Sequence, residues 1–90
     1  MGDLLLIVWA DAVTEGHGWR SLERIRILDP EIIYTVGWLV KETPMSITLV
    51  SSITGDGDAD GDIVLPKGCI LQRVLLSGSN INGILTTKGA

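Results

Sequence analysis

The sequence predicts a single small, mainly β domain: a five-stranded, strongly bent barrel of the SH3-like or OB-like kind with one short helix. Three observations lead to this prediction. The chain has 90 residues, which is enough for one core and too few for two. Apolar residues alternate along several short segments, as they do in strands. Short turns rich in Gly and Pro separate these segments, and only one segment has helical spacing.

The first half of the chain predicts two strands with a helix between them. Residues 4–9 form an apolar run that is too short for a good helix, so we expect a strand buried on both faces. Residues 21–28 predict a short helix, with Ser21 as the N-cap and Asp29-Pro30 as its end. From Glu31 onward the pattern alternates with apolar residues on both faces, which indicates a strand packed on two sides.

The second half predicts three more strands and a tail. A turn at Thr43-Pro44 leads into a hairpin partner over 45–53, and two further strands cover 63–65 and 70–76. We expect Gly37 to mark a bend or a close approach of two backbones. The domain is predicted to span residues 1–78. Residues 79–90 are rich in Ser, Asn, Gly and Thr, and predict a loosely ordered tail or a segment ordered by a partner.

The composition predicts a homo-oligomer. Apolar residues make up 46% of the chain, more than so small a domain can bury, and such a surplus favours a subunit interface. The longest apolar run covers residues 4–10, well short of the roughly 20 residues that span a bilayer, so no membrane segment is expected. The single Cys69 cannot form an intrachain disulfide, which is typical of a cytoplasmic protein.

No residue pattern indicates catalysis, and we expect neither an enzyme nor a cofactor. His17 lies between two glycines and fits an exposed loop histidine, and Cys69 fits a small core residue. These two residues alone cannot complete a zinc site. Trp9 and Trp38 are expected in the core or an interface, whereas Trp19 is expected to pack the preceding loop against the helix.

The acidic run Gly55–Asp62 has the spacing Asp-x-Asp-x-Asp-Gly that opens an EF-hand calcium loop. The twelfth position of such a loop needs a bidentate Glu, and here it is Lys67. The flanking segments are β-patterned, whereas an EF-hand has a helix on each side. The run therefore predicts a tight turn between strands, with a weak calcium site of another kind as the alternative.

Two motifs give the chain a family resemblance. Gly37-Trp38-Leu39 is followed by Met45-Ser46-Ile47-Thr48-Leu49, and a second run over 61–70 ends in Pro66-Lys67-Gly68-Cys69-Ile70. With these motifs the chain resembles the Sm-like (LSm) proteins, and most closely the small Sm-like proteins encoded by phages, including cyanophages. The departures are Ser46 in place of a base-gripping Asn, Lys67 in place of Arg, an added Pro66, and a helix after the first strand instead of before it.

The resemblance implies a barrel whose edge strands pair with neighbouring copies into a closed ring. It also implies a site for single-stranded RNA at the pore, with Ser46 for hydrogen bonding, Lys67 for phosphate and the Gly68 backbone for close approach. For Lys67-Gly68 the alternative is an ordinary hairpin turn. The net charge of −4 argues against a protein that coats nucleic acid by bulk charge, but it leaves room for a local basic patch.

Two hypotheses of function follow from the resemblance. The first is an RNA-binding Sm-like ring, and the second is a structural or protein-interaction ring of phage origin that binds no RNA. A calcium-stabilised module is a third. If the chain is phage-encoded, the host cytoplasm is its expected location.

Overall fold

The computed structural model of the protein describes residues 2–76. Strands make up most of this part of the chain, and it contains a single short helix, as the sequence predicts. The elements are, in order, β1 (Leu4–Asp11), α1 (Leu22–Arg26), β2 (Glu31–Glu42), β3 (Ser46–Val50), β4 (Ser52–Ile53), β5 (Ala59–Asp60), β6 (Ile63–Pro66), a 3-10 turn η1 (Lys67–Cys69) and β7 (Ile70–Leu75). The tail predicted for 79–90 lies outside the described residues.

Five strands form one antiparallel sheet in the order β6-β3-β2-β1-β7. The first strand therefore lies inside the sheet, and the last strand pairs beside it. Strands β6 and β7 are the two edges and do not pair with each other, so the sheet is open within one copy. The two short strands β4 and β5 form a separate hairpin.

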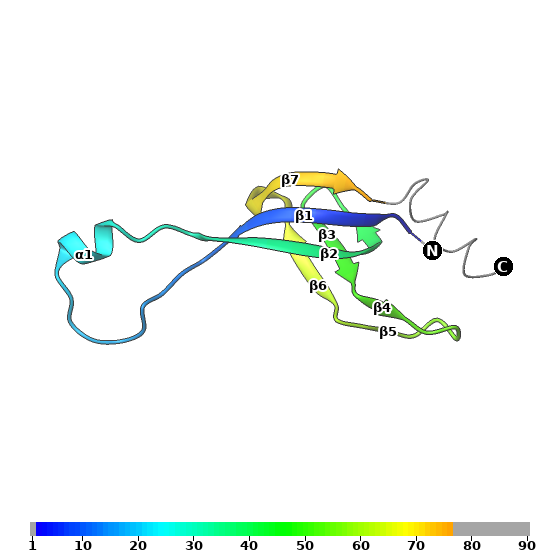
Figure 1. Cartoon of the computed structure of the whole chain (residues 1–90), viewed down its shortest axis with the longest axis horizontal. Helices are drawn as coiled ribbons and strands as arrows, with labels where there is room; N and C mark the ends of the chain where they lie inside the picture. Colours follow the sequence, from blue (N-terminus) through cyan, green and yellow to red (C-terminus); the bar gives the residue numbers. More distant parts are fainter. Residues whose placement is uncertain (1, 77–90) are drawn as a thin grey trace.

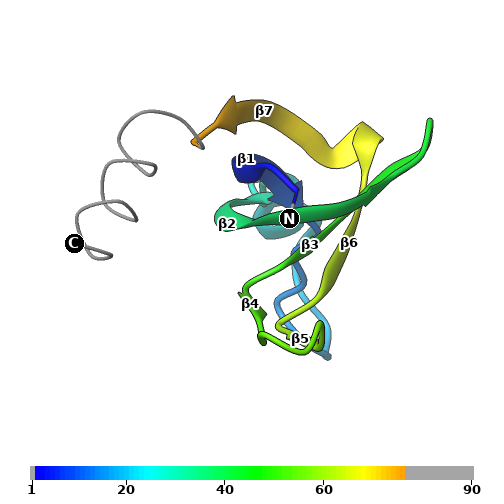
Figure 2. The same ribbon diagram turned by 90° about the vertical axis from the view of Figure 1, so that its right-hand side faces the viewer.

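The long strand β2 is shared between two neighbours, and this bends the sheet. Its residues 31–38 pair with β1, and its residues 38–42 pair with β3. The register shifts between Leu39 and Lys41, and such a bulge increases the local twist. As a result β3 and β6 run steeply across β1 and β2 (Figures 1 and 2).

The core lies on the concave side of this bent sheet. It is built from Leu5 and Ile7 of β1, Ile47 and Leu49 of β3, and Leu65 of β6, all almost fully buried. Trp9 packs against this cluster, and its indole N–H donates to the Thr35 hydroxyl at 2.9 Å. Trp9 was expected in the core or an interface, and it lies against the core with its polar atom satisfied.

Only one face of β1 and β2 is buried, so the prediction of burial on both faces is wrong. On β2 the residues that point to the opposite face are Ile32, Tyr34 and Val36, which we call the outer stripe. Their exposed fractions are 44%, 70% and 51%. The residues paired with them on β1 (Ala10, Val8 and Leu6) are only half-buried. No element of the described chain covers this apolar face.

Gly37 lies where the backbone of β2 closely approaches β3, as expected from its place inside a strand. A Cβ added at this position would lie 3.0 Å from both the Leu49 Cβ and the Val50 carbonyl oxygen. Gly37 faces the core side, directly opposite Leu5. The missing side chain lets β3 pack closely on β2.

The acidic run forms a tight β-hairpin turn, which confirms the prediction of a turn. The Thr54 amide donates to the Asp58 carbonyl at 2.7 Å, and the Asp58 amide donates to the Thr54 hydroxyl at 3.0 Å. Gly57 and Gly61 have φ of 94° and 69°, which glycine adopts without strain. The flanking segments are strands, and among residues 2–76 no three Asp, Glu, His or Cys side chains are grouped to hold a metal.

Residues 12–30 form an arm that leaves the sheet between β1 and β2 and carries α1 at its far end (Figure 1). The N-cap prediction is confirmed, because the Ser21 hydroxyl accepts a hydrogen bond from the Arg24 amide at 3.2 Å. No residue of α1 is buried. The prediction that Trp19 packs the loop against the helix is wrong, since the Trp19 side chain is fully exposed.

The arm is held in shape by its own polar contacts. Glu15 forms ion pairs with Arg20 at 3.3 Å and with Arg24 at 3.2 Å. Arg20 also donates to the Glu15 carbonyl oxygen at 2.6 Å. Gly16 and Gly18, with φ of 91° and 121°, turn the chain back toward the helix. The arm is therefore a projection with polar contacts of its own, and its large apolar side chains are exposed.

We predict that the substitution Ile7→Ala lowers the free energy of unfolding by about 2–5 kcal/mol, because it leaves a cavity in the centre of the core. Urea denaturation monitored by tryptophan fluorescence measures this change. The matched control is Met45→Ala, at an exposed turn position, which should change stability by less than about 0.5 kcal/mol. Equal effects of the two substitutions would contradict the assigned core.

Candidate nucleic-acid interface

The three residues predicted to contact RNA meet at one end of the sheet, where β3 begins and β6 ends. Ser46, the first residue of β3, pairs with Pro66, the last residue of β6. Lys67 and Gly68 follow directly in η1. The Lys67 amide extends the ladder by donating to the Met45 carbonyl at 2.8 Å. Antiparallel pairing thus joins two motifs that lie about 20 residues apart in the sequence.

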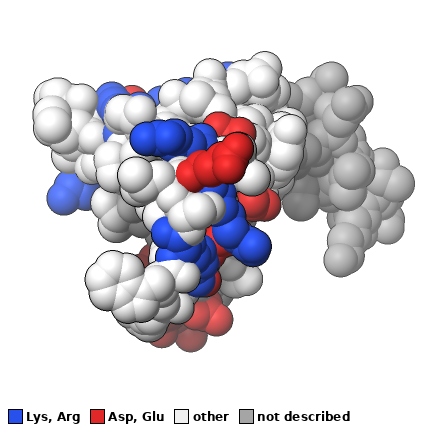
Figure 3. Space-filling model, turned by 90° about the vertical axis from the view of Figure 1, so that its left-hand side faces the viewer, with Lys and Arg blue, Asp and Glu red and all other residues white. Residues whose placement is uncertain are grey.

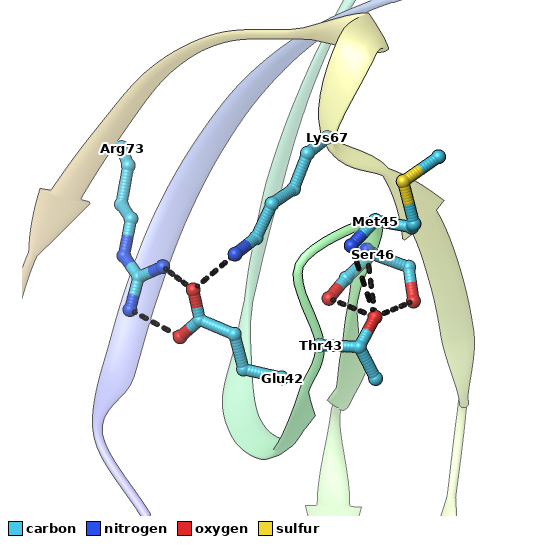
Figure 4. A network of polar contacts seen from close by, with 6 residues as sticks. All are labelled: Glu42, Thr43, Met45, Ser46, Lys67 and Arg73. Carbon is cyan, nitrogen blue, oxygen red and sulfur yellow. Dashed lines mark hydrogen bonds and ion pairs between the residues drawn. The ribbon is translucent and has the colours of Figure 1, made fainter.

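Thr43 organises the turn that precedes Ser46 (Figure 4). Its hydroxyl accepts hydrogen bonds from the amides of Met45 at 3.2 Å and Ser46 at 3.0 Å. The hydroxyls of Thr43 and Ser46 lie 3.2 Å apart and share a hydrogen bond. The Ser46 hydroxyl is thereby oriented, and it retains capacity for one more bond because a hydroxyl both donates and accepts.

Lys67 is part of a three-membered ionic cluster that we call the Glu42 cluster. The Lys67 ammonium lies 2.8 Å from Glu42 Oε2, and the Arg73 guanidinium contacts both carboxylate oxygens, at 3.0 and 3.2 Å (Figure 4). Hydrogen bonds from Arg73 first and Lys67 second lower the pKa of Glu42 to about 2. The carboxylate is consequently charged at every physiological pH.

The Glu42 cluster carries two positive charges and one negative charge, so its net charge is +1. Each of the three side chains is 35–39% exposed, and all can be reached from solvent. A phosphate that bound here would have to compete with the Glu42 carboxylate for Lys67 and Arg73. Figure 3, viewed from the arm end, shows Lys and Arg interspersed with Asp and Glu, without a continuous basic surface on this face.

The Gly68 backbone is open to approach. A Cβ added at Gly68 would meet no atom within 4 Å, so the described residues leave room for a ligand beside it. Cys69, next in η1, is a half-buried free thiol. His17 lies in the arm, in the segment between β1 and α1. The described residues enclose no pocket, so any ligand would bind on the surface.

Thr43, Glu42 and Arg73 also belong to this region, although they are not among the residues predicted from the sequence. Thr43 directly precedes Pro44 and could have been recognised as a side chain that caps the turn. Glu42 and Arg73 are 31 residues apart, and no local spacing relates them. They meet because β7 returns beside β1 and reaches the end of β2.

Comparisons with protein-family models, with curated proteins and with solved structures give no match to this chain. Within residues 2–76, no helix is long and apolar enough to span a bilayer.

We predict that the Glu42 carboxylate titrates with a midpoint near pH 2 in the folded protein, against an ordinary value of 4.5. Because the folded pKa is lowered, the cluster stabilises the fold fully above pH 4.5, and this stabilisation is lost as the pH falls toward 2. NMR titration of the side-chain carboxyl carbon measures the midpoint. Arg73→Gln should raise the midpoint more than Lys67→Gln does, whereas Arg26→Gln, in the arm, should leave it unchanged. A midpoint unaffected by Arg73→Gln would show that the cluster does not form in solution.

Proposed function

We propose that this chain is an Sm-like assembly module that joins copies of itself into a ring through its two edge strands, β6 and β7. The observation that carries the proposal is the strand order β6-β3-β2-β1-β7, in which both edges are unpaired among residues 2–76. A row of unpaired backbone groups on an edge strand is a template for pairing with another chain. Pairing β6 of one copy with β7 of the next would use both edges and close a ring.

The ladder geometry indicates which backbone groups these edges offer. Hydrogen-bonded and non-hydrogen-bonded pairs alternate along antiparallel strands. Since Lys67 bonds to Met45, the backbone groups of Val64 and Pro66 point away from β3. Since the Leu76 amide bonds to the Leu4 carbonyl, the backbone groups of Arg73 and Leu75 point away from β1. Both edges therefore have bonding groups directed outward.

Side chains on the two edges support the same proposal. Val64 on β6 is 60% exposed, and Leu71 and Leu75 on β7 are about equally exposed. Burying them between copies would account for part of the apolar surplus of the composition. Pro66 also fits, because its missing N–H would have pointed outward and its absence breaks no bond inside the sheet.

We predict that Val64→Pro separates the ring into smaller species without unfolding the subunit. The Val64 N–H points outward, so the substitution removes a donor used between copies and none used within the sheet. Native mass spectrometry or light scattering measures the assembly, and circular dichroism reports the fold. Val64→Thr keeps the N–H and should assemble as the wild type does. A wild-type monomer in dilute buffer, or an unchanged mass for Val64→Pro, would refute the ring.

A second candidate function is the binding of single-stranded RNA at the end of the sheet that holds Ser46, Lys67 and Gly68. The specific observation is that these residues lie together and that Lys67 belongs to the Glu42 cluster, in which two cations share one carboxylate. Repetition around a ring would multiply a weak contact into usable affinity. If the ring binds no RNA, it is a structural module.

For RNA binding we predict opposite effects of two substitutions. Lys67→Ala removes a cation and should weaken binding of short U-rich or A-rich oligonucleotides. The plot of log affinity against log salt should become less steep by about one unit for each phosphate that is no longer neutralised. Glu42→Gln removes the competing carboxylate and should strengthen binding. Fluorescence anisotropy at several salt concentrations measures both, with Lys41→Ala as a control outside the cluster. Absence of binding by an assembled wild-type ring would assign the structural role.

A further inference from the structure

The sheet has a mostly apolar surface that no residue of 2–76 covers, on the side of β1 and β2 that faces away from the core. It includes the outer stripe and reaches across three strands, because residues that pair directly point to the same face. We call this whole surface the outer face. Besides the outer stripe, its members are Trp38 on β2, Leu4, Leu6, Val8 and Ala10 on β1, and Gln72 and Val74 on β7. None of these side chains is charged.

Pairing of the edge strands does not account for the outer face. The proposed ring uses backbone groups of β6 and β7, which point sideways in the plane of the sheet, whereas the side chains of the outer face stand perpendicular to that plane. Edge pairing alone would leave Tyr34 and Val36 exposed to water. A contiguous apolar surface of this kind marks a contact that the described residues do not make.

The described part of the chain ends beside the outer face. The Leu76 amide donates to the Leu4 carbonyl at 2.8 Å, which extends the β1–β7 ladder by one residue and places Leu76 opposite Leu4. Leu4 in turn pairs with Trp38, at one end of the outer face. Residues 77–90, which we call the C-terminal segment, therefore start next to this surface, with only β1 between them and β2.

The apolar residues of the C-terminal segment have helical spacing. Ile81, Ile84 and Leu85 stand at i, i+3 and i+4, which puts all three on one face of a helix, whereas in a strand Ile84 would point away from the other two. Ser79 is a suitable N-cap, and Gly89 fits the position after the last turn. So short a helix is marginal in water by itself, and packing on an apolar surface would stabilise it.

The length of the C-terminal segment matches the surface. The outer stripe runs over five residues of β2, which is about 13 Å at the rise of a strand. A helix over residues 80–88 would be about 14 Å long. The three residues before it can extend about 10 Å, which is about two strand spacings and so the distance from β7 across β1 to β2. The segment can therefore reach the outer stripe and lie along it.

Charge distinguishes the C-terminal segment from the arm as the cover of the outer face. Lys88 is the only charged side chain in the segment, so residues 77–87 can lie on an uncharged surface without removing any charge from water. The arm, by contrast, has six charged side chains within residues 12–30. With the +1 of Lys88 set apart from the total of −4, the rest of the chain has a net charge of −5, which attracts Lys88.

We propose that the C-terminal segment folds back over the outer face of its own copy, with Ile81, Ile84 and Leu85 packed on the outer stripe. The contact is made by side chains above the sheet, so it leaves the edges β6 and β7 available for pairing between copies. It is therefore independent of the proposed ring, and either can fail without the other. The segment would cover an apolar surface that otherwise favours unspecific association.

An intramolecular disulfide tests this proposal in the full chain with the single cysteine replaced, Cys69→Ser. The test variant has Val36→Cys with Ile84→Cys, and the matched control has Leu75→Cys with Ile84→Cys. Leu75 pairs with Leu5 and so lies on the core side of the sheet, and it is 59% exposed against 51% for Val36. The control positions are much closer in sequence, so a segment without a fixed place would link them more readily.

We expect the opposite order if the segment is docked. After mild oxidation, positions 36 and 84 should link within one chain, seen as a faster-migrating monomer on a non-reducing gel, and positions 75 and 84 should link little. A predominant link between 75 and 84 would show that the segment is not held on the outer face. Absence of any link at position 36 would refute the contact. The assembly mass of the same variants, measured by native mass spectrometry, reports the ring separately.

A mixture of two singly substituted chains distinguishes contact within a copy from contact between copies. One chain has Val36→Cys and the other has Ile84→Cys, both with Cys69→Ser. We expect little heterodimer, because each outer face is already covered by its own segment. Efficient heterodimer formation would overturn the proposal and assign the outer face to the C-terminal segment of a second copy.

The single tyrosine of the chain gives a second measurement that needs no introduced cysteine. Docking would shield Tyr34, so its nitration by tetranitromethane should be slow in the Cys69→Ser chain. Ile84→Ser should accelerate the nitration severalfold, because Ile84 lies on the proposed docking face of the segment. Thr86→Ser, on the opposite face of the same helix, is the matched control and should leave the rate unchanged. Equal rates in all three chains would refute the contact.

Discussion

The architecture depends on β2 pairing with two neighbours that run in different directions. Its first residues hold β1, and its last residues hold β3, so the strand must bend where the one pairing gives way to the other. Gly37 and the bulge between Leu39 and Lys41 lie at this point. The bend folds β3 and β6 over β1, and the side chains of Leu5, Ile47 and Leu65 are buried together for that reason. A straight β2 would leave the two halves of the core apart.

Glu42 connects this bend to η1 and β7. It is the last residue of β2, and it is bound by Lys67 of η1 and Arg73 of β7. Exposed ion pairs of this kind stabilise a fold only weakly, and we assign the cluster mainly an orienting role. It keeps the Lys67 side chain beside the turn that carries Ser46, and it links β7 to the end of β2, a strand with which β7 shares no ladder. Any anion that approached Lys67 would meet two cations already aligned on a carboxylate.

Local patterns predicted most of the strands, the Ser21 cap and the turn in the acidic run, because each depends on spacing within a few residues. They failed where the outcome depends on distant parts of the chain. The apolar residues on both faces of β1 and β2 predicted burial on two sides. An alternating pattern shows that a face is apolar, but it does not show whether another part of the same copy covers that face. A staple requires the residue directly before the cap, which is Arg20 and not Trp19. The two motifs were enough to predict that Ser46, Lys67 and Gly68 lie close together. That Glu42 and Arg73 also lie there could be known only from the order of the strands in the sheet.

Pro66 limits how far edge-to-edge association can extend. Fibrils of stacked strands need a donor and an acceptor at every outward position, repeated without interruption from chain to chain. Pro66, at the end of β6, has no N–H, so the backbone groups that point outward from this strand lack one donor. A partner strand that extended past Val64 could bond to the Pro66 carbonyl but would receive no hydrogen bond from Pro66. The edge therefore offers only a short row of bonding groups, and Pro66 at its end makes β6 a poor template for the long, uninterrupted pairing of an aggregate.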